Sequence, residues 1–276
     1  MYEKKSIIAD GFHTAFLEAG DPTNDTIVLV HDGGYGSDAE LCWSEMIPFL
    51  TDQFHVLAPD LLGWGGTDKA VFLDRPPYAP RVKHIAEFCL ALGVDRAHFV
   101  GASFGGSVVM RAITDPSSPW PAIRAVSISG TGGPYRLPDG IAALADYTPS
   151  LEEAARMTGY MVRSVDGMDE HIRQRYENSL VPGHWEAMNA PRLSNPVVKR
   201  PPVADPFLER LGRNETPTLL IEGRHDELLE TGWATKLADL SPKVHAVELD
   251  SAHEPNVDAP EETASAIIRF LTGDPE

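Results

Sequence analysis

Ser103 lies in the pattern Gly-x-Ser-x-Gly, which is bounded by Gly101 and Gly105. A serine in this pattern occupies a tight turn between a strand and a helix, with its hydroxyl clear of the sheet. The two glycines remove the Cβ atoms that would clash at such a turn. The following helix directs backbone N–H groups and its positive dipole end toward an oxyanion formed beside the serine. The pattern therefore predicts a nucleophilic serine, the alternative being an incidental serine in a glycine-rich turn.

A serine hydroxyl is a weak nucleophile that needs a general base, and the base needs an orienting partner. His253 follows a predicted strand at 244–249, and Asp226 follows a predicted strand at 218–222. Because functional groups of an open α/β sheet gather at the carboxyl ends of its strands, both side chains are expected beside Ser103. We therefore predict that His253 is the base and that Asp226 orients it. The rivals are His225 as the base, and Asp239, Asp250 and Glu227 as the acid.

The loop at 31–34 reads His-Asp-Gly-Gly and follows an apolar run. Attack on a carbonyl produces an oxyanion that needs two N–H donors. We predict that these donors are the backbone amides of Gly33 and of Phe104, the residue directly after the nucleophile. Gly34 allows the backbone to approach a substrate closely, and His31 is expected to hold the loop together.

Apolar runs alternate with helical patterns along most of the chain. This alternation predicts an α/β fold with a mostly parallel, doubly wound sheet and crossover helices. The strands are predicted at 6–9, 13–19, 26–30, 54–58, 97–100, 123–129, 218–222 and 244–249. Helices are predicted at 41–50, 81–92 and 261–271, with another directly after the nucleophile.

The pattern changes between residues 132 and 206, where helical patches and many prolines occur without a clear buried strand. We therefore predict a core formed by 1–131 and 207–276, with an inserted helical cap at 132–206. Such a lid is expected to set substrate specificity. Its candidate pocket residues, which would otherwise be contacts between lid helices, are Tyr135, Tyr160, Met161, His184, Trp185 and Met188.

Composition limits the classes of partner. The chain has 276 residues, of which 42% are hydrophobic, and its formal net charge is −18. This charge argues against nucleic acid or an anionic membrane as a partner and leaves a small-molecule substrate. No stretch approaches the length of a membrane span, and residues 1–10 lack the apolar region of a signal peptide. Cys42 and Cys89 form no CxxC motif, so reduced thiols and a cytoplasmic location are expected. The predicted chemistry needs no metal or cofactor, and the sequence leaves a homo-oligomer possible.

These motifs together resemble the α/β-hydrolase superfamily over nearly the whole chain, and within it the meta-cleavage product hydrolases. The resemblance implies an α/β-hydrolase fold and a serine-dependent enzyme that hydrolyses a C–C bond in vinylogous 1,5-diketones from aromatic ring cleavage. It also implies that Arg175 binds the dienoate end of the substrate. The narrower likeness lies in His31-Asp32-Gly33-Gly34 with Trp43-Ser44, in Gly101-Ala102-Ser103-Phe104-Gly105-Gly106, and in Arg175-Tyr176-Glu177.

Three positions depart from that family pattern. Asp32 stands where the family usually has glycine, Ala102 where it has asparagine, and Glu254 where it has tryptophan. The two acids bring potential negative charges to the active edge, where they would repel an anionic substrate and raise the pKa of the base. The candidate substrate contacts are Arg175, Asp32, Gly34, Trp185 and Glu254. For Arg175, as for Arg163 and Arg173, the alternative is a solvated helix position.

The sequence thus predicts a serine hydrolase that cleaves a C–C bond in a ring-fission dienoate. A carboxylesterase or lactonase with the same three catalytic side chains is the first alternative. A ligand receptor derived from a hydrolase, or a cofactor-free oxygenase of the same fold, is a more distant one.

Overall fold

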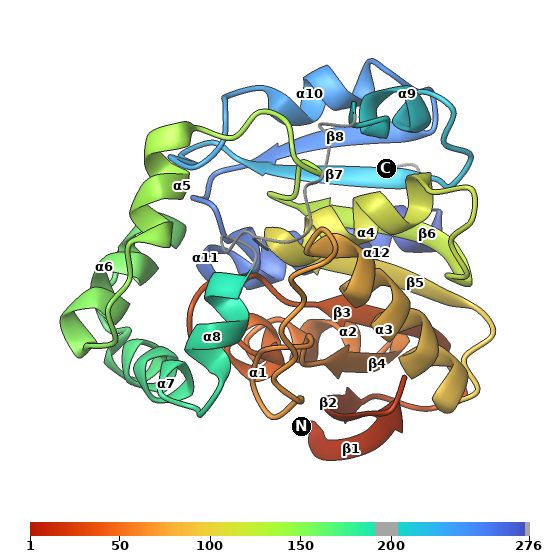
Figure 1. The fold of residues 1–276 in the computed structure, drawn as a ribbon. Coiled ribbons are helices and arrows are strands. Elements are labelled where there is room, and N and C mark those ends of the chain that lie inside the picture. The colour runs from red at the N-terminus through yellow and green to blue at the C-terminus, as the bar shows by residue number, and fades with distance from the viewer. Residues whose placement is uncertain (191–203, 274–276) are drawn as a thin grey trace.

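The computed structural model describes residues 1–190 and 204–273. Its centre is an eight-stranded sheet with the spatial order β1-β2-β4-β3-β5-β6-β7-β8 (Figure 1). β1 and β2 pair antiparallel, as do β2 and β4, and all other neighbours are parallel, which confirms the predicted sheet. The strands are β1 (Glu3–Ala9), β2 (Phe12–Ala19), β3 (Asp25–Val30), β4 (Phe54–Pro59), β5 (Ala97–Ala102), β6 (Ala122–Ile128), β7 (Thr218–Gly223) and β8 (Val244–Leu249).

Strand β3 illustrates why the sheet is covered on both faces. Ile27 and Leu29 pack into one apolar cluster, Val28 and Val30 pack into another, and all four are fully buried. Side chains alternate between the two faces of a strand, so a continuous apolar run is stable only between two helical layers.

The two layers are formed by helices from different parts of the chain. α1, α2 and α12 contribute to the first cluster, and α3 and α4 to the second. The core helices are α1 (Ala39–Trp43), α2 (Ile47–Leu50), α3 (Tyr78–Ala91), α4 (Phe104–Thr114), α9 (Phe207–Leu211), α10 (Trp233–Ala238), α11 (Pro255–Asp258) and α12 (Pro260–Thr272).

Among the described residues, four further helices lie between β6 and α9, within the predicted cap interval. Figure 1 shows them grouped on one side of the sheet, where the carboxyl ends of the parallel strands lie. They are α5 (Pro138–Ala145), α6 (Leu151–Met161), α7 (Asp169–Ser179) and α8 (His184–Asn189). Among the described residues, no helix combines the length and the apolar character needed to cross a membrane.

The predicted helix at 41–50 is wrong in one respect, because the structure has two short helices there, α1 and α2. Pro48 lies in the first turn of α2. Proline has no backbone N–H and clashes with the preceding turn, so it starts a helix rather than continuing one.

Asp60, directly after β4, joins the start of α1 to the loop that follows β4. Its carboxylate accepts hydrogen bonds from the amides of Ala39 (2.8 Å) and Gly66 (2.7 Å). Burial, followed by the nearby charge of Asp38, raises the pKa of Asp60 to about 7, against the lowering effect of these two amides. Between about pH 4 and pH 7 the carboxyl group of Asp60 is therefore protonated in the folded state but ionised in the unfolded chain. Its contribution to the free energy of unfolding falls as pH rises through this range.

We expect the free energy of unfolding of the wild type to fall between pH 5 and pH 8 by at least about 1 kcal/mol more than that of Asp60→Asn. Urea unfolding at both pH values measures this difference. Asp52→Asn, at an exposed position, is the matched control. Equal pH slopes for wild type and Asp60→Asn would contradict the assignment of this titration to Asp60.

Candidate active site

Ser103 occupies the turn between β5 and α4 in a strained conformation. Its φ is 50° and its ψ is −111°, a region that residues with a side chain rarely adopt. A Cβ atom on Gly105 would lie only 2.1 Å from the carbonyl oxygen of Val30, so glycine is required there. The turn therefore presents the serine hydroxyl at the carboxyl end of β5, as the sequence pattern predicts.

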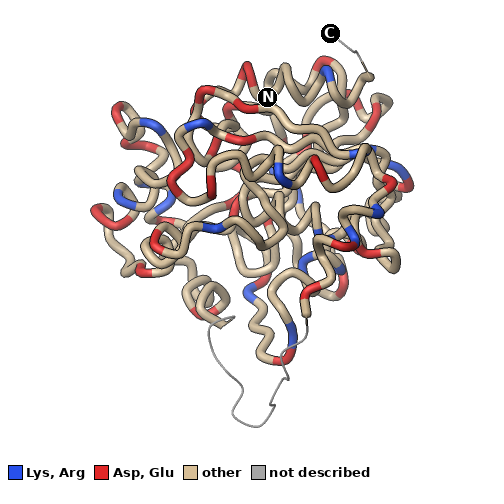
Figure 2. The backbone as a smooth tube through the Cα atoms, turned by 90° about the horizontal axis from the view of Figure 1, so that it is seen from above, with Lys and Arg blue, Asp and Glu red and all other residues tan. Residues whose placement is uncertain are grey.

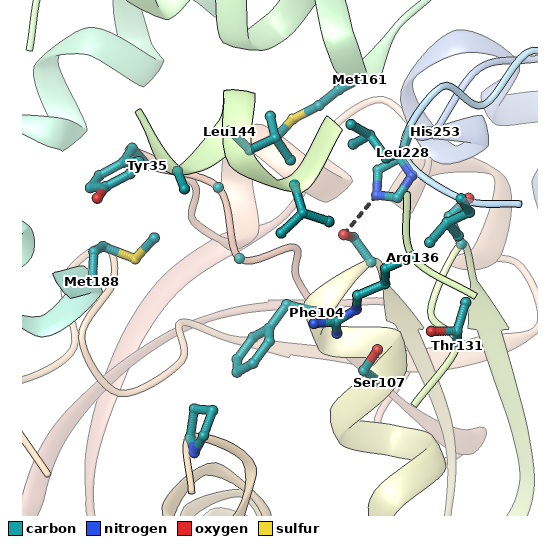
Figure 3. Close-up of a pocket in the computed structure, with 18 of the residues that line it drawn as sticks. Tyr35, Phe104, Ser107, Thr131, Arg136, Leu144, Met161, Met188, Leu228 and His253 are labelled. Carbon is teal, nitrogen blue, oxygen red and sulfur yellow. Dashed lines mark hydrogen bonds between the residues drawn. The ribbon is translucent and has the colours of Figure 1, made fainter. Parts of the chain in front are cut away.

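Three side chains that follow separate strands form a chain of hydrogen bonds at this hydroxyl, and Figure 3 shows the contact that His253 makes with it. The Oγ of Ser103 lies 2.8 Å from Nε2 of His253, and Nδ1 of His253 lies 2.7 Å from Oδ2 of Asp226. An ionised carboxylate can only accept, so Nδ1 carries the proton and Nε2 is left to accept the proton of the serine hydroxyl. The side chains of His253 and Asp226 are each only 3% exposed, so this chain of hydrogen bonds is shielded from water.

The rival residues lie elsewhere. Nε2 of His225 is 2.8 Å from Oδ1 of Asp250, and both side chains are exposed. Asp239 and Glu227 are also exposed. The structure therefore brings Asp226 and His253 to the serine and leaves the alternatives on the surface.

The glycine-rich loop after β3 passes directly beside the serine. A Cβ atom on Gly33 would lie 2.6 Å from Cβ of Phe104, and both residues line the pocket, so the two backbones converge there. His31 holds this loop: its Nε2 accepts from the amide of Leu61 (2.9 Å), and its Nδ1 donates to the carbonyl of Asp32 (2.6 Å). Burial lowers the pKa of His31 to about 4, so it stays neutral in this role.

The serine opens into a cavity of about 310 Å³ between the core and the lid (Figure 3). Its wall is mostly apolar, and Gly34 is part of it, as expected. The lining residues include Trp64, Ile141, Leu144, Ala187, Leu228 and Leu229. Of the predicted lid residues, Met161 and Met188 line the cavity.

The other lid predictions are corrected. Trp185 is 50% exposed and does not line the cavity. Tyr135 and Tyr160 are also outside the lining residues. His184 is buried and joins the lid to the core, because its Nε2 accepts from the amide of Gly36 (2.9 Å) and its Nδ1 donates to the carbonyl of Gly63 (2.8 Å).

Arg175, Asp32 and Glu254 form a buried group behind the glycine-rich loop, and each is only 1% exposed. Nη2 of Arg175 lies 3.9 Å from Oε2 of Glu254, and Nη1 donates to the carbonyl of Tyr35 (3.3 Å). None of the three is among the residues that line the cavity, so the structure places them behind its wall rather than in it, and their contact with substrate stays a prediction. The physical reason for this position is the two departures from the family pattern, because the acids at 32 and 254 supply buried partners for the guanidinium.

The two acids of this group differ in protonation. Burial raises the pKa of Glu254 well above its usual value, and the neighbouring charge of Asp32 raises it further. Burial alone would raise the pKa of Asp32 as well, but the charge of Arg175 and hydrogen bonds from Ser37 and Gly34 lower it. These effects favour the neutral form of Glu254 and the ionised form of Asp32.

Sequence reasoning missed two arginines that line the cavity, Arg81 and Arg136. Arg81 lies in the amphipathic helix α3, where nothing distinguishes it from a surface position. Arg136 lies in the segment that follows the end of β6 at Ile128. This position after a strand end was the one feature of the sequence that could have pointed to it as a cavity residue. Within the described residues, no three His, Cys, Asp or Glu side chains gather as metal ligands.

Comparison with known proteins identifies the class. The model of the "Alpha/beta hydrolase family" matches residues 27–266. The chain therefore belongs to the alpha/beta hydrolase family, and it is an enzyme of the hydrolase type.

Within that family the chain is similar to hydrolases of the meta-cleavage type, which confirms the resemblance found in the sequence. It is 30% identical to a 2-hydroxy-6-oxo-2,4-heptadienoate hydrolase of Pseudomonas putida F1, over 86% of this chain and 84% of that one. It is 27% identical to a 2-hydroxymuconate semialdehyde hydrolase of Pseudomonas sp. CF600, over 85% and 81%. A meta-cleavage product hydrolase from Pseudomonas fluorescens IP01 has a similar structure, with a TM-score of 0.81 at 25% identity over 98% and 97% of the two chains.

Proposed function

We propose that this protein is a serine hydrolase in which Ser103 is the nucleophile, His253 the general base and Asp226 its orienting partner. The observation that carries the proposal is the continuous hydrogen-bonded chain of these three side chains at the wall of a cavity. The Oγ attacks a carbonyl carbon while its proton passes to Nε2 of His253. The amides of Gly33 and Phe104 stabilise the resulting oxyanion.

We propose that the substrate is a ring-fission dienoate and that the scissile bond is a C–C bond. Support comes from the names of the similar relatives. A cavity of about 310 Å³ lies at the small end of the range for small-molecule sites. His253 first helps to move the enol proton to the carbon that will leave. After attack by Ser103, the C–C bond breaks and its electron pair enters the conjugated enolate, and water then releases the acyl group from the serine.

Hydrolysis of a small carboxylic ester or lactone is the second candidate. The buried position of Arg175 outside the cavity lining favours it, because a dienoate in the cavity does not meet this arginine directly. The same three catalytic side chains and the same oxyanion donors carry out both reactions.

A direct comparison of substrates distinguishes the two candidates. We expect kcat/KM for 2-hydroxy-6-oxo-2,4-heptadienoate to exceed that for p-nitrophenyl butyrate by at least about tenfold, that is, by about 1.4 kcal/mol of transition-state stabilisation. Loss of the dienolate absorbance and release of p-nitrophenolate report the two reactions. Turnover of the ester without turnover of any ring-fission dienoate would leave the esterase or lactonase as the function.

We also propose that a small molecule is the protein's main partner and that it acts in the cytoplasm. Cys42 and Cys89 are buried free thiols, which supports a reducing compartment. The acidic surface does not favour nucleic acid or anionic lipid (Figure 2).

A further inference from the structure

The charge of the cavity wall is opposite to that of the protein. The chain carries 41 acidic and 23 basic residues, and acidic positions occur on all sides of the molecule (Figure 2). Among the described residues that line the cavity, however, there is no Asp or Glu, whereas Arg81 and Arg136 are both present. An arginine that lines a mostly apolar cavity with no acid beside it offers its donors to an anionic ligand.

Arg81 is bound to the protein backbone through all three of its guanidinium nitrogens. Its Nε (3.3 Å) and Nη2 (3.0 Å) donate to the carbonyl of Leu62, and its Nη1 donates to the carbonyl of Pro77 (3.1 Å). Its guanidinium also lies 5.2 Å from the ring centroid of Trp64. Arg81 therefore fixes the wall of the cavity and adds positive potential, and its guanidinium is held by the backbone on every nitrogen.

Arg136 is different, because its only described side-chain partner is the hydroxyl of Tyr78, to which Nη2 donates (2.6 Å). No carboxylate of the described residues pairs with it, and residues 191–203 contain no Asp or Glu. Arg111 provides a contrast: it lies over the same Tyr78 ring but is paired through both terminal nitrogens with Asp205 (2.7 and 2.5 Å). Nε and Nη1 of Arg136 remain available as the two-pronged donor that suits a carboxylate.

The backbone around Arg136 holds this fork in place. Arg136 forms an isolated antiparallel bridge with Leu229, and the amide of Leu137 donates to the carbonyl of Leu228 (2.9 Å). Figure 3 shows its side chain reaching into the cavity beside Phe104, across from Tyr35. Arg136 therefore lies on the opposite side of the cavity from the loop that covers Arg175.

We infer that Arg136 binds a carboxylate of the substrate and makes this enzyme selective for acyl donors that carry a negative charge. The inference rests on the proposed function, because it assumes that the serine site acts on a molecule in this cavity. It places an anion anchor for the acyl part of the substrate at a residue at the start of the lid, a role distinct from the dienoate contact predicted for Arg175. A charge-assisted bidentate contact of this kind corresponds to about 10- to 100-fold in binding.

Two esters of equal chain length test the inference: mono-p-nitrophenyl succinate, which is anionic, and p-nitrophenyl butyrate, which is neutral. We expect the ratio of kcat/KM for the anionic over the neutral ester to fall about 10- to 100-fold in Arg136→Gln, mainly through KM. Arg136→Lys should recover part of the preference. Arg163→Gln removes an exposed lid arginine and should leave the ratio as in wild type. A ratio that changes less than about twofold in Arg136→Gln, with circular dichroism like wild type, overturns the inference.

A binding measurement separates this result from the proposed function. Calorimetry with the hydrolysis-resistant N-(4-nitrophenyl)succinamic acid and N-(4-nitrophenyl)butyramide reports the charge preference without turnover. A preference for the acid that is lost in Arg136→Gln supports the anchor even if ester hydrolysis proves independent of Ser103. Ser103-dependent hydrolysis without any preference for the acid overturns the anchor and leaves the serine mechanism standing.

Discussion

Replacing Ser103 with alanine is expected to lower kcat by about 10⁴-fold or more on any substrate of this site. The variant keeps the oxyanion donors and the cavity, but it lacks the atom that forms the bond to the carbonyl carbon. Steady-state release of p-nitrophenolate measures the loss, and circular dichroism verifies the fold.

Ser107→Ala is the matched control for this experiment. Ser107 lines the same cavity, but its Oγ accepts a hydrogen bond from the amide of Gly132 (3.2 Å) and does not contact His253. We expect kcat to change by less than about tenfold in this variant. Comparable losses in both variants would mean that hydrolysis depends on the shape of the wall rather than on a nucleophile at 103.

Replacing Arg175 with methionine is expected to lower the free energy of unfolding by about 3–5 kcal/mol. The substitution removes the cation that holds Asp32 ionised in a site that is only 1% exposed, so a buried charge loses its partner. Urea unfolding at pH 7 measures the change. A loss of this size would be a large part of the stability of a typical domain.

Arg173→Met is the control on the same helix, because the side chain of Arg173 is 56% exposed and pairs at the surface with Glu170. An exposed ion pair contributes at most about 1 kcal/mol, so this variant should remain near wild type. Glu254→Gln should also be mild, because burial and the neighbouring charge of Asp32 raise the pKa of Glu254 and so favour its neutral form. If Arg175→Met is as stable as Arg173→Met, Arg175 does not serve as the counter-charge of this group.

The parts of the site that follow from local rules were predictable from sequence. Ser103 is fixed by glycines on either side, and His253 and Asp226 follow strands whose carboxyl ends must share one edge of a parallel sheet. These assignments do not depend on which side chains of the lid contact the core. The interrupted helix at 41–50 was predictable in principle as well, because Pro48 lies within it.

The environment of the arginines was not predictable in the same way. The residue type at 175 matches the family pattern, but its function depends on Asp32 and Glu254, which reach it from distant parts of the chain. Arg136 precedes a lid helix in an irregular segment, which backbone contacts with residues 228–230 hold at the cavity. The order of charges along the sequence does not show which arginines have a partner in the fold. An arginine with such a partner is structural, whereas an arginine without one is available to a substrate.

The central claim is that the hydroxyl of Ser103 is the attacking group, and a p-nitrophenyl alkylphosphonate tests it most directly. Attack forms an Oγ–P bond and expels p-nitrophenolate, so the protein keeps a stable phosphonyl group on the nucleophile. Intact-mass and peptide mass spectrometry should find one phosphonyl group per chain, on Ser103, with activity lost in proportion to labelling. Inactivation with the label on another residue, or full activity in protein modified at Ser103, would contradict the account.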